Sequence, residues 1–556
     1  MAVKLTPFAK LLIGAIVLVG AGSVLWNLYK NRKPDTDDKV AVATKGGDSA
    51  PASTAGAALG KGDGPLGSAD NPLKVSIVSF HGYAPALVAN GQSLKTQPGS
   101  LFDQEGLNVE FIIQDDIPTI STVFEAGTAQ CIWRTSDFWA QEQPNLRNSG
   151  HDAKAVMIVD NTRGADAIIS NNPAIRTVED LAGRKVAMLQ FTPSHGMTID
   201  AIDNSSLSAR KKQTVQYVFI SAEDGLAGVR AALESGSVDA AVLWDPDLSL
   251  AVRSTRSRVI YSTKTASNLI FDVIVCDQRV LDDGNGRAAV QKLVNGWMKG
   301  VDAAKANPDA AVDALVKTEE FFTLLAKDEG KPFVKKLFDN LLWTGVADNA
   351  RILGMSGGTN HYGRVYQRFD QIYREAGALA NPKSPVIDPS QSFDTSFIRK
   401  LYDASTTAQA EAVKTETFTV AEREQAVQAP AEVTKPVTVN FSSGQAALSK
   451  RAERTIDTDM VPFIENNGTA YFEISGNTDS TGNATVNERL SQARAEAVAD
   501  YLSKQWEFPR ERFKIVGNGP RKPLCNENNP ETEGLSIDAC REANRSTRIA
   551  VYGARP

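Results

Sequence analysis

The chain has 556 residues, of which 42% are hydrophobic and 23% charged, and its formal net charge is −6. This length exceeds what one hydrophobic core accommodates and predicts about three or four folded units. The small net charge, without a long basic run, argues against a nucleic-acid-binding protein. The four cysteines and four histidines form no close cluster, which argues against a zinc site.

The first unit, residues 1–33, contains an uncharged run of 19 residues, Leu11–Tyr29. At about 1.5 Å per residue, a helix of this length nearly spans the ~30 Å hydrocarbon core. Trp26 and Tyr29 stand at its far end, where aromatic rings favour the headgroup layer. We therefore expect a retained transmembrane anchor. A cleaved signal peptide is the alternative, because the small residues at 21–23 suit a peptidase.

Residues 34–71 are rich in small and polar residues and predict a flexible linker. In residues 72–401, short apolar runs alternate with helical stretches, which predicts an α/β unit of parallel sheets covered by helices on both faces. Because this unit is long, we expect two lobes. The expected strands are Val75–Phe80, Val109–Ile113, Gln130–Trp133, Ala155–Val159, Ala167–Ser170, Val186–Leu189, Val215–Ile220, Ala240–Leu243, Val259–Ser262 and Ile270–Val275.

Residues 402–435 are dominated by Ala, Thr, Glu and Gln and predict a second linker, with a short solvated helix as an open alternative. Residues 436–556 return to a compact α+β pattern. The expected strands there are Val437–Phe441, Tyr471–Ser475, Phe513–Val516 and Arg548–Tyr552, and the expected helices are Leu448–Glu465 and Val486–Gln505.

A motif in two halves marks this last unit. Ser475-Gly-Asn-Thr-Asp-Ser-Thr-Gly482 follows the central strand, and Asn487-Glu-Arg-Leu-Ser-Gln-Ala-Arg-Ala495 opens a helix. Together they resemble the peptidoglycan-binding domain of the OmpA family, which pairs a Thr-Asp with an Asn-x-x-Leu-Ser-x-x-Arg-Ala helix. Asp479 precedes Arg494 by the family's interval of fifteen residues. The resemblance implies that this unit binds the cell wall.

The chemistry of the two charged residues is consistent with that role. Diaminopimelate in the wall peptide carries an ammonium group and a carboxylate. Asp479 can accept the ammonium, and Arg494 can hold the carboxylate in a bidentate fork. An ordinary surface ion pair between Asp479 and Arg494 is the alternative. The resemblance implies four further pocket residues: Thr478, Asn487, Leu490 and Arg545.

The four cysteines fall into two sets. Some members of the OmpA family carry a disulfide at the place of Cys525 and Cys540, so the resemblance implies one here, which suits an oxidising periplasm. Cys131 and Cys276 fall in or beside expected strands, and we expect them to be buried thiols.

Residues 72–401 resemble periplasmic substrate-binding proteins of the nitrate/sulfonate/taurine and thiamine-precursor type. The resemblance rests on Val75–Phe80 with the loop at 82–85, on Thr177–Val186 and on Gly236–Pro246. It implies a ligand cleft between two lobes. The thiamine-precursor enzymes of this fold carry a cysteine-rich motif that is absent here, so we expect no enzymatic activity.

Ligands of such folds bind where strands end. The residues that follow the expected strands, and are therefore candidates for the cleft, are Tyr83, Thr135, Ser136, Asp137, Thr192, Ser194, His195, Trp244 and Asp245. A helix N-terminus with hydroxyl groups favours an anion, which suggests a small anionic or zwitterionic solute. Thr192 and Ser194 as simple helix caps, and His195 as a structural histidine, are the alternatives.

These expectations combine into a wall-tethered receptor of the bacterial inner membrane, with a cytoplasmic N-terminus and residues 34–556 in the periplasm. Its partners would be peptidoglycan, a solute, the membrane and an unidentified membrane protein complex. One alternative is a structural envelope linker whose binding-protein fold is a spacer or docking surface. A stator-like component of an ion-driven complex is another, but Leu11–Tyr29 lacks the acidic residue that carries protons in such proteins.

Overall fold

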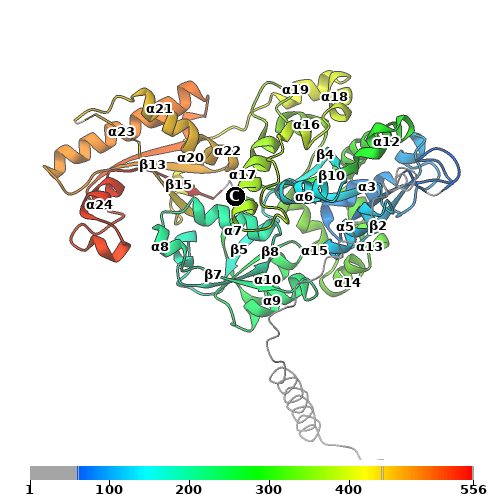
Figure 1. The fold of residues 1–556 in the computed structure, drawn as a ribbon, viewed down its shortest axis with the longest axis horizontal. Helices are drawn as coiled ribbons and strands as arrows, with labels where there is room; N and C mark the ends of the chain where they lie inside the picture. Colours follow the sequence, from blue (N-terminus) through cyan, green and yellow to red (C-terminus); the bar gives the residue numbers. More distant parts are fainter. Residues whose placement is uncertain (1–58, 61, 440, 443, 554–556) are drawn as a thin grey trace, which may run out of the picture. The chain divides into compact units, whose positions relative to one another are not determined.

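The computed structural model describes residues 59–60, 62–439, 441–442 and 444–553. These residues belong to one compact unit that begins at Thr54 and contains three sheets in its described part (Figure 1). The predicted anchor, Leu11–Tyr29, lies outside the described residues. Among the described residues, no helix combines the length and the apolar character needed to cross a bilayer.

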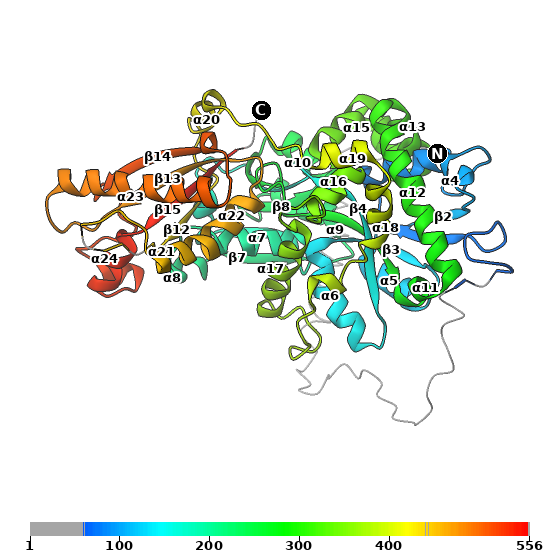
Figure 2. The same cartoon turned by 90° about the horizontal axis from the view of Figure 1, so that it is seen from above.

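Helices cover the sheets of all three parts (Figures 1 and 2). The helices up to the end of the second lobe are α3 (Ala84–Ala89), α4 (Leu101–Gln104), α5 (Ile117–Glu125), α6 (Ser136–Asn148), α7 (Pro193–Asp203), α8 (Ala209–Lys212), α9 (Gly225–Glu234) and α10 (Asp247–Thr255). Those that follow are α11 (Gln278–Asp282), α12 (Gly284–Ala306), α13 (Pro308–Thr318), α14 (Glu320–Glu329), α15 (Lys331–Leu337), α16 (Val346–Ile352), α17 (His361–Glu375), α18 (Ser396–Asp403), α19 (Thr406–Ala412), α20 (Val420–Ala426), α21 (Lys450–Thr455), α22 (Val461–Asn466), α23 (Ala484–Gln505) and α24 (Ile537–Asn544).

The first lobe is built on a six-stranded sheet. Its strands, in spatial order, are β11 (Leu341–Trp343), β4 (Ala153–Thr162), β10 (Phe271–Asp277), β3 (Cys131–Thr135), β1 (Leu73–Ile77) and β2 (Val109–Ile113). β1 is parallel to β2 and β3, whereas β10 runs antiparallel to both β3 and β4. β1, β3 and β4 therefore end at one edge of the sheet, and β10 begins there.

The second lobe has a five-stranded sheet. Its strands, in spatial order, are β7 (Gln216–Ile220), β6 (Lys185–Leu189), β8 (Ala240–Trp244), β5 (Asp166–Ser170) and β9 (Arg258–Ser262). Side chains alternate between its faces, as the pleat requires. Ala167 and Leu243 pack with α9 and α10, whereas Ile168 and Val242 belong to the larger core that includes Met197 of α7. The chain enters this lobe after β4 and leaves it before β10.

The last unit has a four-stranded sheet. Its strands, in spatial order, are β12 (Val433–Val437), β15 (Thr547–Tyr552), β13 (Tyr471–Asn477) and β14 (Phe513–Gly519). α23 lies along β13 and β14 (Figure 2). Gly476 and Gly517 allow this close approach, because a Cβ atom on either would lie 2.0 Å and 2.6 Å from the backbone of Ser491 and Gln492, respectively.

The predicted strands of the two lobes are all present, and the two-lobed α/β and α+β architecture is confirmed. The prediction of parallel sheets is correct only for β1–β3 and β6–β8, because β10, β11, β5 and β9 pair antiparallel with their neighbours. Apolar runs alone do not encode strand direction, which depends on where the chain re-enters each sheet. The short strand β11 has no counterpart among the expected strands.

Two further expectations need correction. Cys131 and Cys276 are not free thiols but form a disulfide between β3 and β10, where they are direct cross-strand partners. The predicted linker 402–435 contains α19 and α20 and ends in β12, the edge strand of the last sheet. Ala408 and Ala412 of α19 are buried, so this polar segment still has a packed face.

Candidate functional site

Acidic side chains gather at the edge of the first sheet where β1, β3 and β4 end. Asp160 of β4 and Asp272 of β10 are cross-strand partners, and Asp272 faces Thr135 of β3 on its other side. The hydroxyl of Tyr83 and the indole N–H of Trp133 both donate to Asp272 Oδ2, at 2.9 and 3.0 Å. The two carboxyl groups thus lie side by side beneath the loop that follows β1.

Asp160 sits directly against this loop. A Cβ atom on Gly82 would lie 2.0 Å from Asp160 Oδ2, so only glycine fits beside the carboxyl group. Neither oxygen of Asp160 has a hydrogen-bond partner, although the residue is fully buried. An unpartnered buried carboxylate costs folding free energy, because it loses its hydration without gaining a replacement.

A third carboxyl group, that of Asp137, is linked to the second lobe through Tyr373. Asp137 begins α6, directly after β3, and its Oδ2 lies 3.5 Å from the hydroxyl of Tyr373. That hydroxyl donates to the carbonyl of Thr192, before α7, at 2.8 Å. Tyr373 therefore holds two of the predicted segments, 135–137 and 192–195, close together across the lobes.

Two more carboxyl groups come from the second lobe. Asp166 begins β5 and is the cross-strand partner of Trp244 at the end of β8. The next residue, Asp245, accepts hydrogen bonds from the backbone of Ser249 at 2.9 Å and from the side chain of Asn340 at 2.7 Å. Trp244 is half-buried, whereas both acids are buried.

We call these five residues, Asp137, Asp160, Asp166, Asp245 and Asp272, the interlobe acid cluster. All are at most 4% exposed. Burial raises the pKa of Asp137 and Asp245 to about 6 and that of Asp272 to about 7. Burial and the neighbouring carboxyl groups raise the pKa of Asp160 and Asp166 well above the usual value. The cause is the same throughout: low dielectric surroundings and like charges disfavour ionisation.

No lysine or arginine of the described residues forms an ion pair with any member of the cluster (the ion pairs of the chain involve other acids). The buried guanidinium of Arg134, on the neighbouring strand, pairs with Glu142 instead. Several hydroxyl groups of the region also lack partners. Those of Thr135 and Thr162 lie beside Asp137 and Asp166 without hydrogen bonds of acceptable geometry, and that of Ser194 has none.

The remaining predicted residues lie elsewhere or serve the backbone. The Ser136 hydroxyl accepts the backbone N–H of Phe271 at 3.3 Å. The ring of His195 lies among Phe191, Tyr217 and Phe219, 4.9 Å from the last of these, and burial lowers its pKa to about 4. The structure therefore places this ring among aromatic rings on the side of β7.

A cavity of about 760 Å³ opens beside the second-lobe end of the cluster. Ser249 and Asn340, the two residues that hold Asp245, both line it. Asp245 is thus close to accessible space, although it is itself buried.

The charged residues of the last unit form a separate site. Asp479, after β13, pairs with Arg545, after α24, at 2.5 Å, and its Oδ1 accepts the backbone N–H of Thr481 at 3.1 Å. Arg494 of α23 instead donates to the carbonyl of Gln445 at 3.1 Å and lies over the ring of Phe441. The alternative of a plain Asp479–Arg494 ion pair does not match this geometry.

We call Asp479, Arg494 and Arg545 the Asp479 site. The pKa of Arg494 is lowered by burial and by the positive charge of Arg545. Asp479 contacts Arg545 directly, and Arg494 is close enough to Arg545 to feel its charge, an arrangement suited to a ligand that carries an ammonium group and carboxylates.

The other predicted residues of this site shape its walls. The Thr478 hydroxyl donates to the carbonyl of Asp479 at 3.0 Å, and the Asn487 side chain donates to the carbonyl of Thr481 at 2.8 Å. Leu490 is half-buried on the helix that carries Arg494. These contacts fix the loop between β13 and α23.

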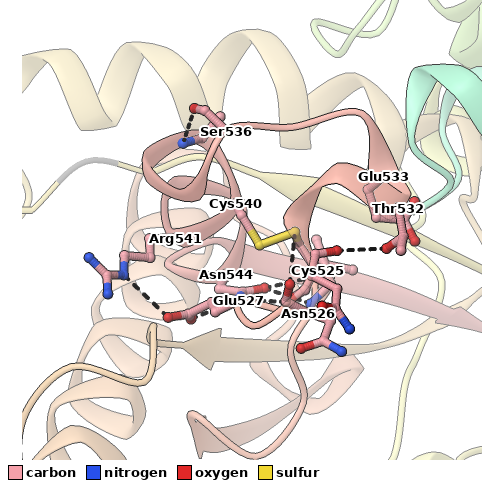
Figure 3. Close-up of a disulfide and its surroundings, with 12 residues drawn as sticks. Cys525, Asn526, Glu527, Thr532, Glu533, Ser536, Cys540, Arg541 and Asn544 are labelled. Atoms are coloured by element: carbon pink, nitrogen blue, oxygen red, sulfur yellow. Dashed lines mark hydrogen bonds and ion pairs between the residues drawn. A yellow bond between two sulfur atoms is a disulfide. The ribbon is translucent and has the colours of Figure 1, made fainter.

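A disulfide between Cys525 and Cys540 fastens the segment before α24, as the resemblance implies (Figure 3). Asn544 strengthens the same segment. Its Oδ1 accepts the backbone N–H groups of Leu524 and Cys525, at 2.7 and 3.0 Å, and its amide donates to Glu527 at 2.9 Å. The residue that these bonds position is the next one, Arg545.

With this geometry in place, comparison with known proteins assigns the last unit. Residues 440–534 match the OmpA family. The OmpA-like domain is therefore shown for this part of the chain, and residues 97–311 match the family described as NMT1/THI5 like. Both resemblances inferred from the sequence are confirmed for these residues.

Individual relatives cover parts of the chain. An aliphatic sulfonates-binding protein of Escherichia coli is 33% identical over 93 residues, 17% of this chain and 27% of the relative. Outer membrane protein P5 of Haemophilus influenzae is 28% identical over 134 residues, 23% of this chain and 37% of the relative. The chain thus spans only about a quarter to two fifths of these curated relatives. The crystal structure of the periplasmic aliphatic sulphonate binding protein SsuA of Escherichia coli aligns with a TM-score of 0.44 and 16% identity, covering 58% of this chain and 97% of that one.

Sequence reasoning missed three of the five cluster residues: Asp160, Asp166 and Asp272. A signal was present, because each acid stands within or beside a run of β-branched and aliphatic residues where a charge is costly to bury. Within the described ranges, no three His, Cys, Asp or Glu side chains are arranged as ligands for a metal ion.

Proposed function

We propose that this protein is a receptor of the bacterial envelope that joins a solute-binding module to a peptidoglycan clamp. The N-terminal run Leu11–Tyr29 would anchor it in the inner membrane, with the rest of the chain in the periplasm. The observation that carries the proposal is the Asp479 site, in which Asp479 and Arg494, within the residues that match the OmpA family, stand with Arg545, which pairs with Asp479.

The clamp would recognise the diaminopimelate of the wall peptide. Its ammonium group would approach Asp479, and its carboxylate would be held by Arg494 with help from Arg545. Charge-assisted and bidentate contacts of this kind are the strong ones in proteins. Because Asp479 is paired with Arg545 in the ligand-free site, the carboxylate is already oriented when the wall peptide arrives.

The two-lobed module would bind a solute rather than catalyse a reaction. A spacer has no need of buried acids without a positive partner at the facing edges of two sheets, and Asp160, whose two oxygens have no hydrogen-bond partner, is costly to bury. This cost favours the receptor over the structural linker. The names of the relatives suggest an anion such as a sulfonate, whereas the charge of the interlobe acid cluster favours another class of solute.

Co-sedimentation with purified peptidoglycan sacculi tests the clamp. We expect the chain to pellet with sacculi and to be released by free diaminopimelate-containing peptide. An otherwise folded chain that stays in the supernatant at all wall concentrations would contradict the proposal.

Reporter fusions test the topology. Alkaline phosphatase fused after Gln428, an exposed residue that follows α20, should be active because this enzyme functions only outside the cytoplasm. Activity of a cytoplasmic reporter alone at this position would exclude the proposed orientation.

A further inference from the structure

The interlobe acid cluster consists of five buried carboxyl groups, none of which forms an ion pair with a lysine or arginine of the described residues. Three of its carboxyl groups come from the first lobe and two from the second, and both sets stand at strand ends that face the other lobe. The nearest fully buried guanidinium, that of Arg134, is already paired with Glu142. The positive partner is therefore missing from the described chain.

The hydrogen-bonding groups of the cluster also indicate a missing positive partner. The two carboxyl oxygens of Asp160 and Oδ1 of Asp137 have no hydrogen-bond partner. Both residues are fully buried, and an ionised carboxyl oxygen only accepts hydrogen bonds. An ammonium group is the complement of these oxygens, since it offers three donors and no acceptor. A sulfonate offers only acceptors and would add negative charge to buried acids.

Aromatic rings complete the surroundings. Tyr83 and Trp133 both donate hydrogen bonds to Asp272, so two aromatic residues adjoin the first-lobe acids. Aromatic faces attract organic cations, and more strongly when water is excluded. A metal ion is disfavoured, because no three His, Cys, Asp or Glu side chains of the described residues are grouped so that they could hold one.

We propose that the interlobe acid cluster binds a small organic cation with at least one ammonium group, an aliphatic amine or diamine, rather than an anion. This inference rests on the proposed receptor function and names the class of its solute. The acids of the first lobe would hold one ammonium group, and Asp166 and Asp245 of the second lobe would hold a second one where the solute has it. Because the acids are buried, the solute enters while the lobes are apart and is enclosed when they close.

Thermal unfolding of the full chain with a panel of solutes tests the inference. The cationic probes are 1,4-diaminobutane and spermidine, and the comparators are taurine, methanesulfonate and neutral amino acids. Tetramethylammonium chloride at equal ionic strength controls for screening. We expect the amines to raise the melting temperature in a saturable manner, and the sulfonates to leave it unchanged.

Two variants locate the site. Asp160→Asn removes an ionisable carboxyl group without changing the size of the side chain and should weaken amine binding at least tenfold, while the ligand-free protein becomes more stable at pH 7.5. Asp272→Asn keeps an acceptor for Tyr83 and Trp133 and serves as a second variant with the same expected loss. Asp200→Asn is the matched control, because Asp200 is equally buried but pairs with Arg368; it should destabilise the protein and leave amine affinity unchanged.

The outcomes separate the two proposals. A shift with sulfonates and none with amines would overturn the cation inference and leave the receptor standing. No shift with any solute would overturn both. An amine shift that survives in both cluster variants would show that the amine binds elsewhere, and the assignment of the site would be wrong.

Discussion

The two charged sites of this protein differ in how their charges are balanced. In the Asp479 site, a carboxylate is paired with Arg545 at 2.5 Å, and Arg494 is held by backbone carbonyl groups near the surface. In the interlobe acid cluster, five carboxyl groups are buried with no positive partner among the described residues. The Asp479 site is preorganised and stable without its ligand. The carboxyl groups of the interlobe acid cluster obtain a positive partner only when a ligand supplies one.

This contrast has an energetic consequence. A paired surface site contributes little to stability in either direction, so it can be mutated with loss of binding but little loss of fold. A buried unpartnered cluster lowers stability until it is neutralised by protons or by a cation. We therefore expect removal of a carboxyl group to change stability little at the Asp479 site and to increase it in the interlobe acid cluster.

The largest expected effect concerns the two disulfides. The Cys131–Cys276 bond joins residues 145 apart in the sequence, and the Cys525–Cys540 bond joins residues 15 apart. Each bond is removed by substituting both of its cysteines with alanine. From loop length, we expect losses of about 5 and about 3 kcal/mol in the free energy of unfolding. Denaturant titration of the oxidised proteins measures both. Equal stability of the first double variant and the wild type would mean that these cysteines are not bonded in solution.

The next effect concerns wall binding. Asp479→Ala and Arg494→Ala should each weaken binding to sacculi by roughly 2–5 kcal/mol, because each leaves a charged partner of the ligand unmatched. This corresponds to well over tenfold in affinity. Arg545→Ala should cost less, since its side chain is 47% exposed. Arg489→Ala, an exposed arginine on the same helix, is the control and should bind like the wild type.

If Arg545→Ala abolishes binding while Arg494→Ala does not, the roles assigned to the two arginines are reversed. Pelleting that is unchanged in both folded variants would place the wall contact outside the Asp479 site.

The smallest effect distinguishes the cluster from its surroundings. His195 is a candidate ligand from its place in the sequence, but its ring lies among three aromatic side chains. We expect His195→Phe to keep the solute-induced rise in melting temperature within error and to lower the free energy of unfolding by about 1 kcal/mol, because Phe cannot accept the backbone N–H of Phe191 that His195 Nδ1 binds at 3.3 Å. If a folded His195→Phe protein no longer shows the solute-induced rise in melting temperature, His195 belongs to the binding site.

Much of the fold could be predicted from periodicity. Apolar runs bounded by turn residues locate the strands, and the two-part motif locates Asp479 and Arg494 from the sequence alone. The direction of β10 and the pairing of Cys131 with Cys276 could not be predicted, because both depend on the return of the chain from the second lobe 145 residues later. Local patterns carry no information about such long-range register.

Only part of the interlobe acid cluster could be predicted from the sequence, because the rest also depends on which strands are neighbours. Tyr83, Asp137 and Asp245 follow strands and can be named from position alone. Asp272 lies inside an expected strand, so its position does not mark it as a strand-end residue. Asp160 comes close to Asp272 only because β4 and β10 are neighbours in the sheet. Arg545 could be named for the other site only through the family resemblance, because it reaches Asp479 from a segment 66 residues away.

The pH dependence of stability tests the central claim, that the interlobe acids are uncompensated. The groups around Asp272 are Asp137, Asp160 and Asp166 and the donors Tyr83 and Trp133; the nearby His81, with its pKa lowered by burial to about 3, stays neutral. A carboxyl group with a raised folded-state pKa stabilises the protein below its unfolded pKa, near 4, and loses that contribution as the pH rises through its folded pKa, about 7 for Asp272.

The direct measurement is the free energy of unfolding of the ligand-free wild type and of Asp272→Asn between pH 4 and pH 8. We predict that the variant gains on the wild type as the pH rises from about 4 to about 7, by a difference on the order of a few kcal/mol, and that the gain then levels off. Asp200→Asn should instead be less stable than the wild type at neutral pH, because it breaks the pair with Arg368. A difference between wild type and Asp272→Asn that is flat or falls with pH would contradict the account, because the carboxylate would then be balanced within the folded protein.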